Sequence, residues 1–285
     1  MRRSTPAAGT RLGERRGLGG LRALGALGAL GACALLVASA AWAQPPGRGA
    51  ALTHPMSAQQ AAPVDLTGYW GSIITQDWLY RVVVNQRGNY VGIPINVHAR
   101  EVADAWNRST DEAAGKQCEA YGAPAILRLP EHLHISWLDP QTLQVQIDAG
   151  MQTRLLRFAP TPGQMHGPPS LQGISVAQWM PYQEGPGFVG AATRRGMRAH
   201  YGWLQVTTTD MQPGLLRKNG VPYSGETHMS ENWAVNADPE GDRWLVVTTT
   251  LDDPTYLQVP YILEDIFQKQ PDATQWDPSP CSLSH

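Results

Sequence analysis

The sequence predicts a mainly β fold: a single antiparallel meander, closed into a β-barrel, with a short helical insertion at about residues 99–121. Segments in which apolar and polar residues alternate recur between residues 66 and 269, as in strands with one buried face. Short turn sequences, not helices, separate most of these segments, which indicates antiparallel neighbours. So long a meander must cover its edges, and barrel closure removes them. Two stacked sheets, a β-sandwich, remain the alternative.

Residues 1–43 have the layout of a secretory signal peptide. An arginine-rich region precedes an apolar run that glycines interrupt, and Ala41-Trp42-Ala43 then supplies an A-x-A cleavage site. We therefore expect an exported protein, periplasmic or secreted, with a retained membrane anchor as the alternative. No later stretch has the length of a membrane span, so no stable membrane insertion is expected after cleavage.

The remainder of the chain divides into a lead-in and one domain. Residues 44–64 are rich in Pro, Gly, Ala and Gln, which predicts a flexible segment. Residues 65–285 then form a single β-barrel domain with a C-terminal tail. Without residues 1–43 the chain keeps 16 Lys and Arg against 23 Asp and Glu. That acidic balance argues against nucleic acid as a partner, and the sequence leaves the oligomeric state open.

The first strand is predicted from Trp70 to Val84. Its alternation places Trp70, Trp78 and Tyr80 on one face, and Gly88-Asn89 forms a hairpin turn before a second strand at 90–96. The helical insertion follows. Val102 and Trp106 are one helical turn apart, and Ser109 with Glu112 makes a capping box that opens a helix carrying Ala114, Cys118 and Tyr121.

The later strands give a total of about nine or ten. Asp139-Pro140-Gln141 and Ala149-Gly150 are turns between the first three of them, and a Pro- and Gly-rich loop at 160–200 contains one further strand. The predicted segments are 132–138, 142–148, 151–158, 171–180, 203–210, 227–235, 243–251 and 260–267.

Cysteine usage agrees with export. Cys33 lies in the predicted leader, which leaves Cys118 and Cys281. Two cysteines in an oxidising compartment most simply form one disulfide, here between the helical insertion and the C-terminal tail. Two free buried thiols are the alternative.

Two resemblances rest on short motifs. Gly68-x-Trp70 resembles the G-x-W of lipocalins, which implies a lipocalin-like barrel whose Trp packs beneath a basic side chain from a late strand, here Lys269 or Arg243. The segments DLTGYW, DAGMQTR, RKNGVPYS, DPTYL and the terminal PSPC are similar to a family of exported bacterial proteins of this length. The second resemblance implies compartment and fold and transfers no catalytic residue.

Metal and cofactor signals are few. His132 and His134 alternate on a predicted strand, so both point to one face at a spacing of about 7 Å and could join a metal site. A solvated or hydrogen-bonded strand face is the alternative interpretation. The chain has no P-loop and no G-x-G-x-x-G after a strand, and we predict no cofactor.

The strongest acid–base candidate is Glu231. Met229, Glu231 and Trp233 share one strand face, and a glutamate buried between these two side chains would have a raised pKa, suited to a general acid or base. On an outward face Glu231 would be an ordinary soluble strand residue. Asp148 and Arg154 bracket a hairpin, where they could pair or aim their charges into a barrel mouth, and Asp148 and His134 are the further catalytic candidates.

Tryptophan is abundant and phenylalanine rare, 10 against 3. Indoles and phenols line apolar pockets while keeping a hydrogen-bond donor. We therefore predict a barrel that binds a small apolar or aromatic molecule, with binding residues Trp78, Tyr80, Arg154, Met229 and Trp233. The alternatives are a cofactor-independent lyase, isomerase or dehydratase in the same barrel, and an envelope scaffold with a filled core. Whether the protein is an enzyme is left open.

Overall fold

The computed structural model describes residues 56–158, 165–181 and 202–284. The predicted signal peptide and the first part of the predicted lead-in lie outside these residues. The rest of the lead-in contains a helical turn, α1 (Ala58–Ala61), which the capping box of Ser57 and Gln60 begins. This turn contacts the barrel, because Ala58 O accepts from Trp179 Nε1 at 2.8 Å. Among the described residues no helix is long and apolar enough to cross a membrane.

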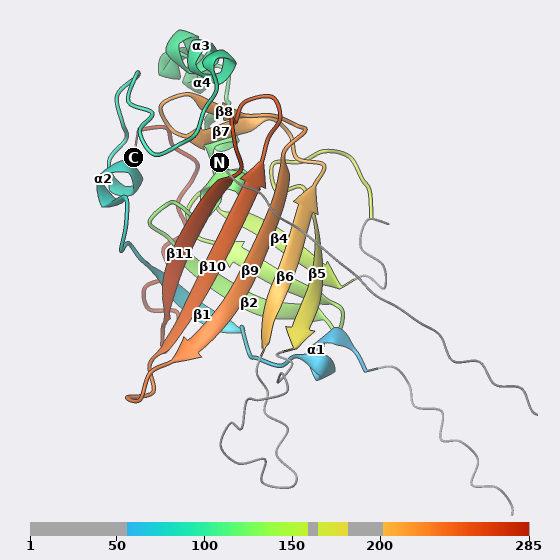
Figure 1. Cartoon of the computed structure of the whole chain (residues 1–285). Helices are drawn as coiled ribbons and strands as arrows, with labels where there is room; N and C mark the ends of the chain where they lie inside the picture. Colours follow the sequence, from blue (N-terminus) through green and yellow to red (C-terminus); the bar gives the residue numbers. More distant parts are fainter. Residues whose placement is uncertain (1–55, 159–164, 182–201, 285) are drawn as a thin grey trace, which may run out of the picture. The chain divides into compact units, whose positions relative to one another are not determined.

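Nine strands form a closed barrel in the order β1-β11-β10-β9-β6-β5-β4-β3-β2 (Figure 1). The mainly β fold, its barrel closure and its helical insertion are confirmed. The barrel strands are β1 (Gly68–Ile73), β2 (His132–Asp139), β3 (Thr142–Ile147), β4 (Gln152–Phe158), β5 (Ile174–Pro181), β6 (Gly202–Thr209), β9 (His228–Ala237), β10 (Arg243–Asp252) and β11 (Tyr261–Lys269).

The barrel is mixed, which corrects the prediction of a purely antiparallel meander. β4 and β5 pair in parallel, with Leu156 opposite Ser175, whereas the other neighbouring pairs are antiparallel. The chain also leaves the barrel between β6 and β9 to form a separate hairpin, β7 (Gly214–Arg217) and β8 (Val221–Tyr223). A parallel neighbour requires a longer crossover connection than the tight turn that joins antiparallel strands.

The first predicted strand is too long. β1 ends at Ile73, and Asp77 in the left-handed region (φ 54°) precedes the short helix α2 (Trp78–Val82). Tyr80 therefore does not share an inward strand face with Trp70, and Trp78 is 64% exposed. The predicted strand at 90–96 is also absent. Only an isolated bridge from Ile95 to Leu257 forms there, in a stretch that contains Pro94 and a left-handed glycine.

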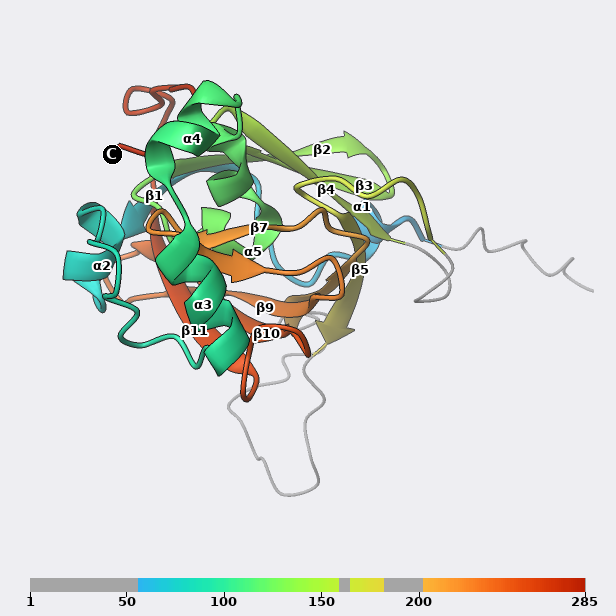
Figure 2. The ribbon, with the colours of Figure 1, turned by 90° about the horizontal axis from the view of Figure 1, so that it is seen from above.

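The helical insertion lies at one end of the barrel, beside the β7–β8 hairpin (Figures 1 and 2). It contains α3 (Val97–Ala105), α4 (Arg108–Ala113), a 3₁₀ helix η1 (Gln117–Tyr121) and α5 (Ala123–Ile126). The capping residue of α4 is Asn107, whose side chain accepts from Thr110 N at 3.2 Å, and not Ser109 as predicted. Asn and Ser cap equally well, so spacing alone does not distinguish them.

Trp70 fixes the start of the barrel wall. Its indole is fully buried and donates to Leu66 O at 2.8 Å. Lys269 of β11 lies over the ring at 4.6 Å and Arg243 of β10 at 6.0 Å, which is the packing that the lipocalin resemblance implies. Gly68 is required beside it, because a Cβ there would overlap the Lys269 ammonium and its φ is +104°.

Candidate ligand site at the end of the barrel

The barrel interior is filled by side chains over most of its length. Trp70 and Trp233 are 0% exposed there and pack in one apolar cluster with Leu133, Val145, Leu204 and Phe267, among others. Trp233, which we predicted to bind a ligand, is therefore packed in the core together with Trp70. The pocket described below lies at the edge of this apolar cluster and shares Ala120 and Tyr121 with it.

A buried ion pair crosses the interior. Arg154 of β4 donates to Glu231 of β9 through both terminal nitrogens, at 2.9 Å to Oε1 and 2.6 Å to Oε2. Arg154 also donates to Thr208 Oγ1 at 3.4 Å, and Thr208 contacts Ser175 at 2.8 Å. Glu231, Met229 and Trp233 are all buried, so the face that they share, whose direction the sequence left open, is the inward one. The Glu231 carboxylate is held by an arginine rather than isolated among apolar groups.

A second charged network joins the middle of β11 to Arg81 and Arg128, which line the pocket described next. Asp265 pairs with Arg81 at 3.1 Å and with Arg128 at 3.3 Å, and Arg128 also pairs with Asp77 at 2.8 Å. Burial raises the pKa of Asp265 to about 6, although the two arginines oppose that shift. Burial likewise raises the pKa of Glu131 well above its ordinary value, and its two carboxyl oxygens have no partner among the described residues.

The predicted metal and acid–base candidates on β2 and β3 are engaged on the barrel wall. His132 Nδ1 contacts Asp148 Oδ2 at 2.8 Å, and Asp148 Oδ1 accepts from His132 N. His134 Nδ1 contacts Gln146 Oε1 at 2.9 Å, and its ring stacks on Tyr69 at 4.3 Å. No group of three or more His, Cys, Asp or Glu that could hold a metal ion occurs in the described part of the chain. The catalytic roles of Asp148 and His134 stay predictions.

A pocket of about 390 Å³ opens at the end of the barrel that carries α2 and the β7–β8 hairpin. Five stretches form most of its wall: α2 with the residues after it, the segment from η1 to Pro130, the end of β7, the start of β11, and the C-terminal tail. Ile93 and Ala149 complete it. Its apolar wall residues include Val82, Val83, Val84, Ile93, Ala120, Pro124, Ala125, Leu129, Leu216 and Leu263.

The polar wall of the pocket is cationic and phenolic. Arg81, Arg128, Arg217 and Lys218 line it, together with the three tyrosines Tyr80, Tyr121 and Tyr261. No Asp or Glu occurs among the described residues that line it. The pocket therefore combines hydrocarbon surface with positive charge and hydroxyl groups.

Arg217 and Tyr80 meet across the pocket from different elements. The Arg217 guanidinium lies over the Tyr80 ring at 5.0 Å and donates to Val91 O at 3.0 Å. Burial lowers the pKa of Arg217 and raises that of Tyr261, because partial removal from water disfavours both charged forms. Arg217 is thus a partly desolvated cation facing a cavity.

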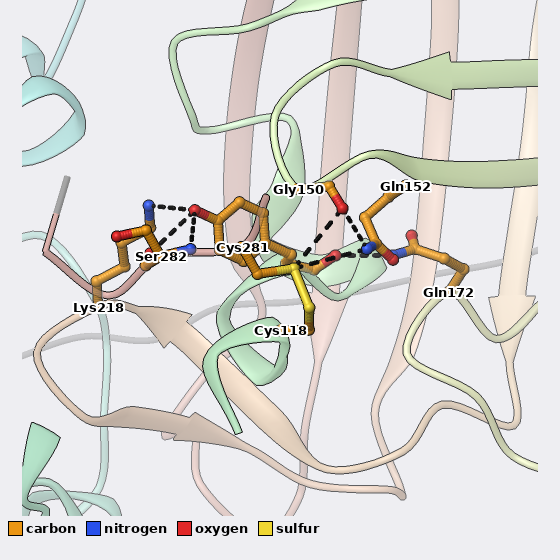
Figure 3. The surroundings of a disulfide bond; sticks show 8 residues. Cys118, Gly150, Gln152, Gln172, Lys218, Cys281 and Ser282 are labelled. Carbon is orange, nitrogen blue, oxygen red and sulfur yellow. Dashed lines mark hydrogen bonds between the residues drawn. A yellow bond between two sulfur atoms is a disulfide. The ribbon is translucent and has the colours of Figure 1, made fainter. Parts of the chain in front are cut away.

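The disulfide joins the C-terminal tail to η1 (Figure 3). Cys118 and Cys281 are joined as predicted, with Cα atoms 5.1 Å apart. The Tyr121 hydroxyl accepts from Ser282 N and donates to Ser282 O, both at 2.9 Å. Lys218 Nζ donates to the same hydroxyl at 2.9 Å. Because Ser279, Pro280 and Ser282 line the pocket, the bridge fixes one of its walls.

The chemistry of Lys218 follows from this setting. Burial lowers the pKa of its ammonium to about 8, and the nearby positive charge of Arg108 acts in the same direction. The side chain also lies over the Tyr121 ring at 4.6 Å.

Of the residues predicted to bind a ligand, the structure places Tyr80 in the wall of this pocket. Trp78 is on the outer side of α2, and Arg154 and Trp233 lie within the filled barrel. Met229 packs in the apolar cluster that contains Leu263, whose side chain reaches the pocket. Sequence reasoning missed Arg81, Arg128, Arg217 and Lys218, which come from three separate segments and share no local pattern.

Comparisons with protein-family models, with curated proteins and with solved structures give no match. The function has to be argued from the geometry of the pocket itself.

Proposed function

We propose that this protein is an exported β-barrel that binds a small, largely apolar or aromatic molecule in the pocket at the end of the barrel. One observation carries the proposal: a walled cavity of about 390 Å³ lies above an otherwise filled barrel. Cavities of roughly 300–1,000 Å³ with apolar walls and a few convergent polar groups are typical ligand sites. The disulfide is compatible with export, since such bonds persist in oxidising compartments.

The lyase, isomerase or dehydratase alternative has no comparable support. Its predicted acid–base residues, Glu231, Asp148 and His134, are not among the described residues that line the pocket. Glu231 instead pairs with Arg154 inside the barrel, and Asp148 pairs with His132.

The test is a fluorescence titration with N-phenyl-1-naphthylamine, a neutral aromatic dye. Val84 is half-buried in the pocket wall, so Val84→Trp should fill the cavity and weaken binding by at least about tenfold, the effect of losing roughly 1.4 kcal/mol. Val259 is exposed and does not line the pocket, so Val259→Trp is the matched control. Equal binding by wild type and both variants would mean that the dye binds elsewhere and the proposal is wrong.

A further inference from the structure

The charges around the pocket do not balance within its own wall. Four cationic side chains line it and no carboxylate does. Arg81 and Arg128 have acidic partners behind the wall, in Asp265 and Asp77. Arg217 forms no ion pair with any described residue. An excess of positive charge therefore faces the cavity.

The Arg217 guanidinium has hydrogen-bonding capacity to spare. It carries five N–H donors in a planar fork, and one nitrogen donates to Val91 O. Stacking on Tyr80 fixes the plane of the fork without using its in-plane donors. A guanidinium held in this way is suited to an oxyanion, to which it can donate two parallel hydrogen bonds.

Burial favours an anion here for a second reason. Partial removal from water penalises the charged form of Arg217, and its lowered pKa reflects that penalty. A bound anion would offset the penalty, because opposite charges attract more strongly where water is partly excluded.

The size of the pocket excludes a bare inorganic anion as its full occupant. A cavity of about 390 Å³ with walls of valine, leucine and isoleucine has room for an organic body as well. The charged end and the apolar walls together specify an amphipathic molecule.

We propose that the ligand of this pocket is an organic anion, with an apolar or aromatic body and a carboxylate, sulfonate or phosphate group that Arg217 binds. This assignment rests on the proposed binding function and names the chemical class of its ligand. Tyr80 holds the guanidinium in orientation, and Tyr261 supplies a hydroxyl in the same wall.

The experiment compares two dyes that share one aromatic body. 1-Anilinonaphthalene-8-sulfonate carries an anionic group, and N-phenyl-1-naphthylamine lacks it. Wild-type protein should bind the sulfonate at least about tenfold more tightly, as one charge-assisted pair provides. Arg217→Gln should reduce that preference to less than about twofold, whereas Arg217→Lys should keep part of it.

Arg100 supplies the matched control, because its guanidinium also lies over a tyrosine ring, Tyr90 at 5.3 Å, but does not line the pocket. Arg100→Gln should leave both affinities unchanged. If the two dyes bind wild type with equal affinity, and both bind Val84→Trp more weakly, the anion assignment is wrong and the binding function stands. If neither dye binds wild type, the proposed function fails as well. An equal loss of preference in Arg217→Gln and Arg100→Gln would also refute the assignment.

Discussion

Breaking the ion pair of Arg154 and Glu231 should cause a large loss in the free energy of unfolding of the barrel. Their side chains are 0% and 1% exposed and joined by two hydrogen bonds. Glu231→Leu leaves the arginine charged inside the barrel without an anionic partner, and Arg154→Met leaves the glutamate without a cation. Removing one member of a buried pair costs about 3–5 kcal/mol, a large share of the roughly 5–15 kcal/mol that stabilise a domain.

The double variant Arg154→Met with Glu231→Leu separates the ion pair from simple packing. Replacing a buried pair by apolar side chains of similar volume is often neutral or stabilising. The double variant should therefore be more stable than either single variant, with a coupling energy of about 3 kcal/mol or more. Urea unfolding of the oxidised protein, followed by tryptophan fluorescence, gives the four free energies.

The control is Lys116 with Glu119, an ion pair at 3.5 Å whose side chains are 50% and 32% exposed. Glu119→Gln should change the free energy of unfolding by less than about 1 kcal/mol. Single Arg154 and Glu231 variants that lose no more than this control would refute the claim that the pair is desolvated in a filled barrel.

Two further predictions concern the cross-link and the buried acid. Replacing Cys118 and Cys281 by serine should lower the free energy of unfolding by about 3–5 kcal/mol. Alkylation of the wild type without reductant should leave both cysteines unlabelled in mass spectra. Labelling of both would contradict the disulfide. The pKa of Asp265 is raised from 3.8 to about 6 in the folded protein, so its contribution to stability should fall as pH rises through that interval, because the folded state binds the proton more tightly. Urea unfolding from pH 4 to pH 7 gives the difference in free energy of unfolding between wild type and Asp265→Asn, and this difference should shift against the wild type as pH rises. A difference that does not change with pH would refute the raised pKa.

The strands that the sequence predicts well are those with long alternation and one buried face. In β9, Met229, Glu231 and Trp233 share one face as their spacing predicts, and that face is buried. The short strands β7 and β8 have four and three residues, too few for a period to be visible. Alternation also cannot report which neighbour a strand takes, so the parallel pairing of β4 with β5 was not predictable.

The stretch after β1 shows how a distant contact overrides a local pattern. Val82, Val83 and Val84 are β-branched and favour a strand. Arg81, however, is buried by its ion pair with Asp265, and the chain turns into α2 to place it there. Asp265 lies near the other end of the sequence, so no local window contains the cause.

The candidate site was predictable only in part for the same reason. Tryptophan content indicates aromatic surface but does not separate a pocket wall from a core, and Trp233 proves to be core. Arg217 lies in RKNGVPYS, a segment whose only signal in the sequence is its resemblance to a family of exported bacterial proteins. Its role depends on Tyr80, more than a hundred residues earlier, and on the disulfide that closes the pocket wall.

Native mass spectrometry of protein purified from its own host tests the central claim most directly. We expect wild type and Val259→Trp to carry a co-purifying small molecule, detected in negative-ion mode after release, and Val84→Trp to lack it. A bare protein mass for the wild type, or the same bound molecule in Val84→Trp, would contradict a ligand site at the end of the barrel.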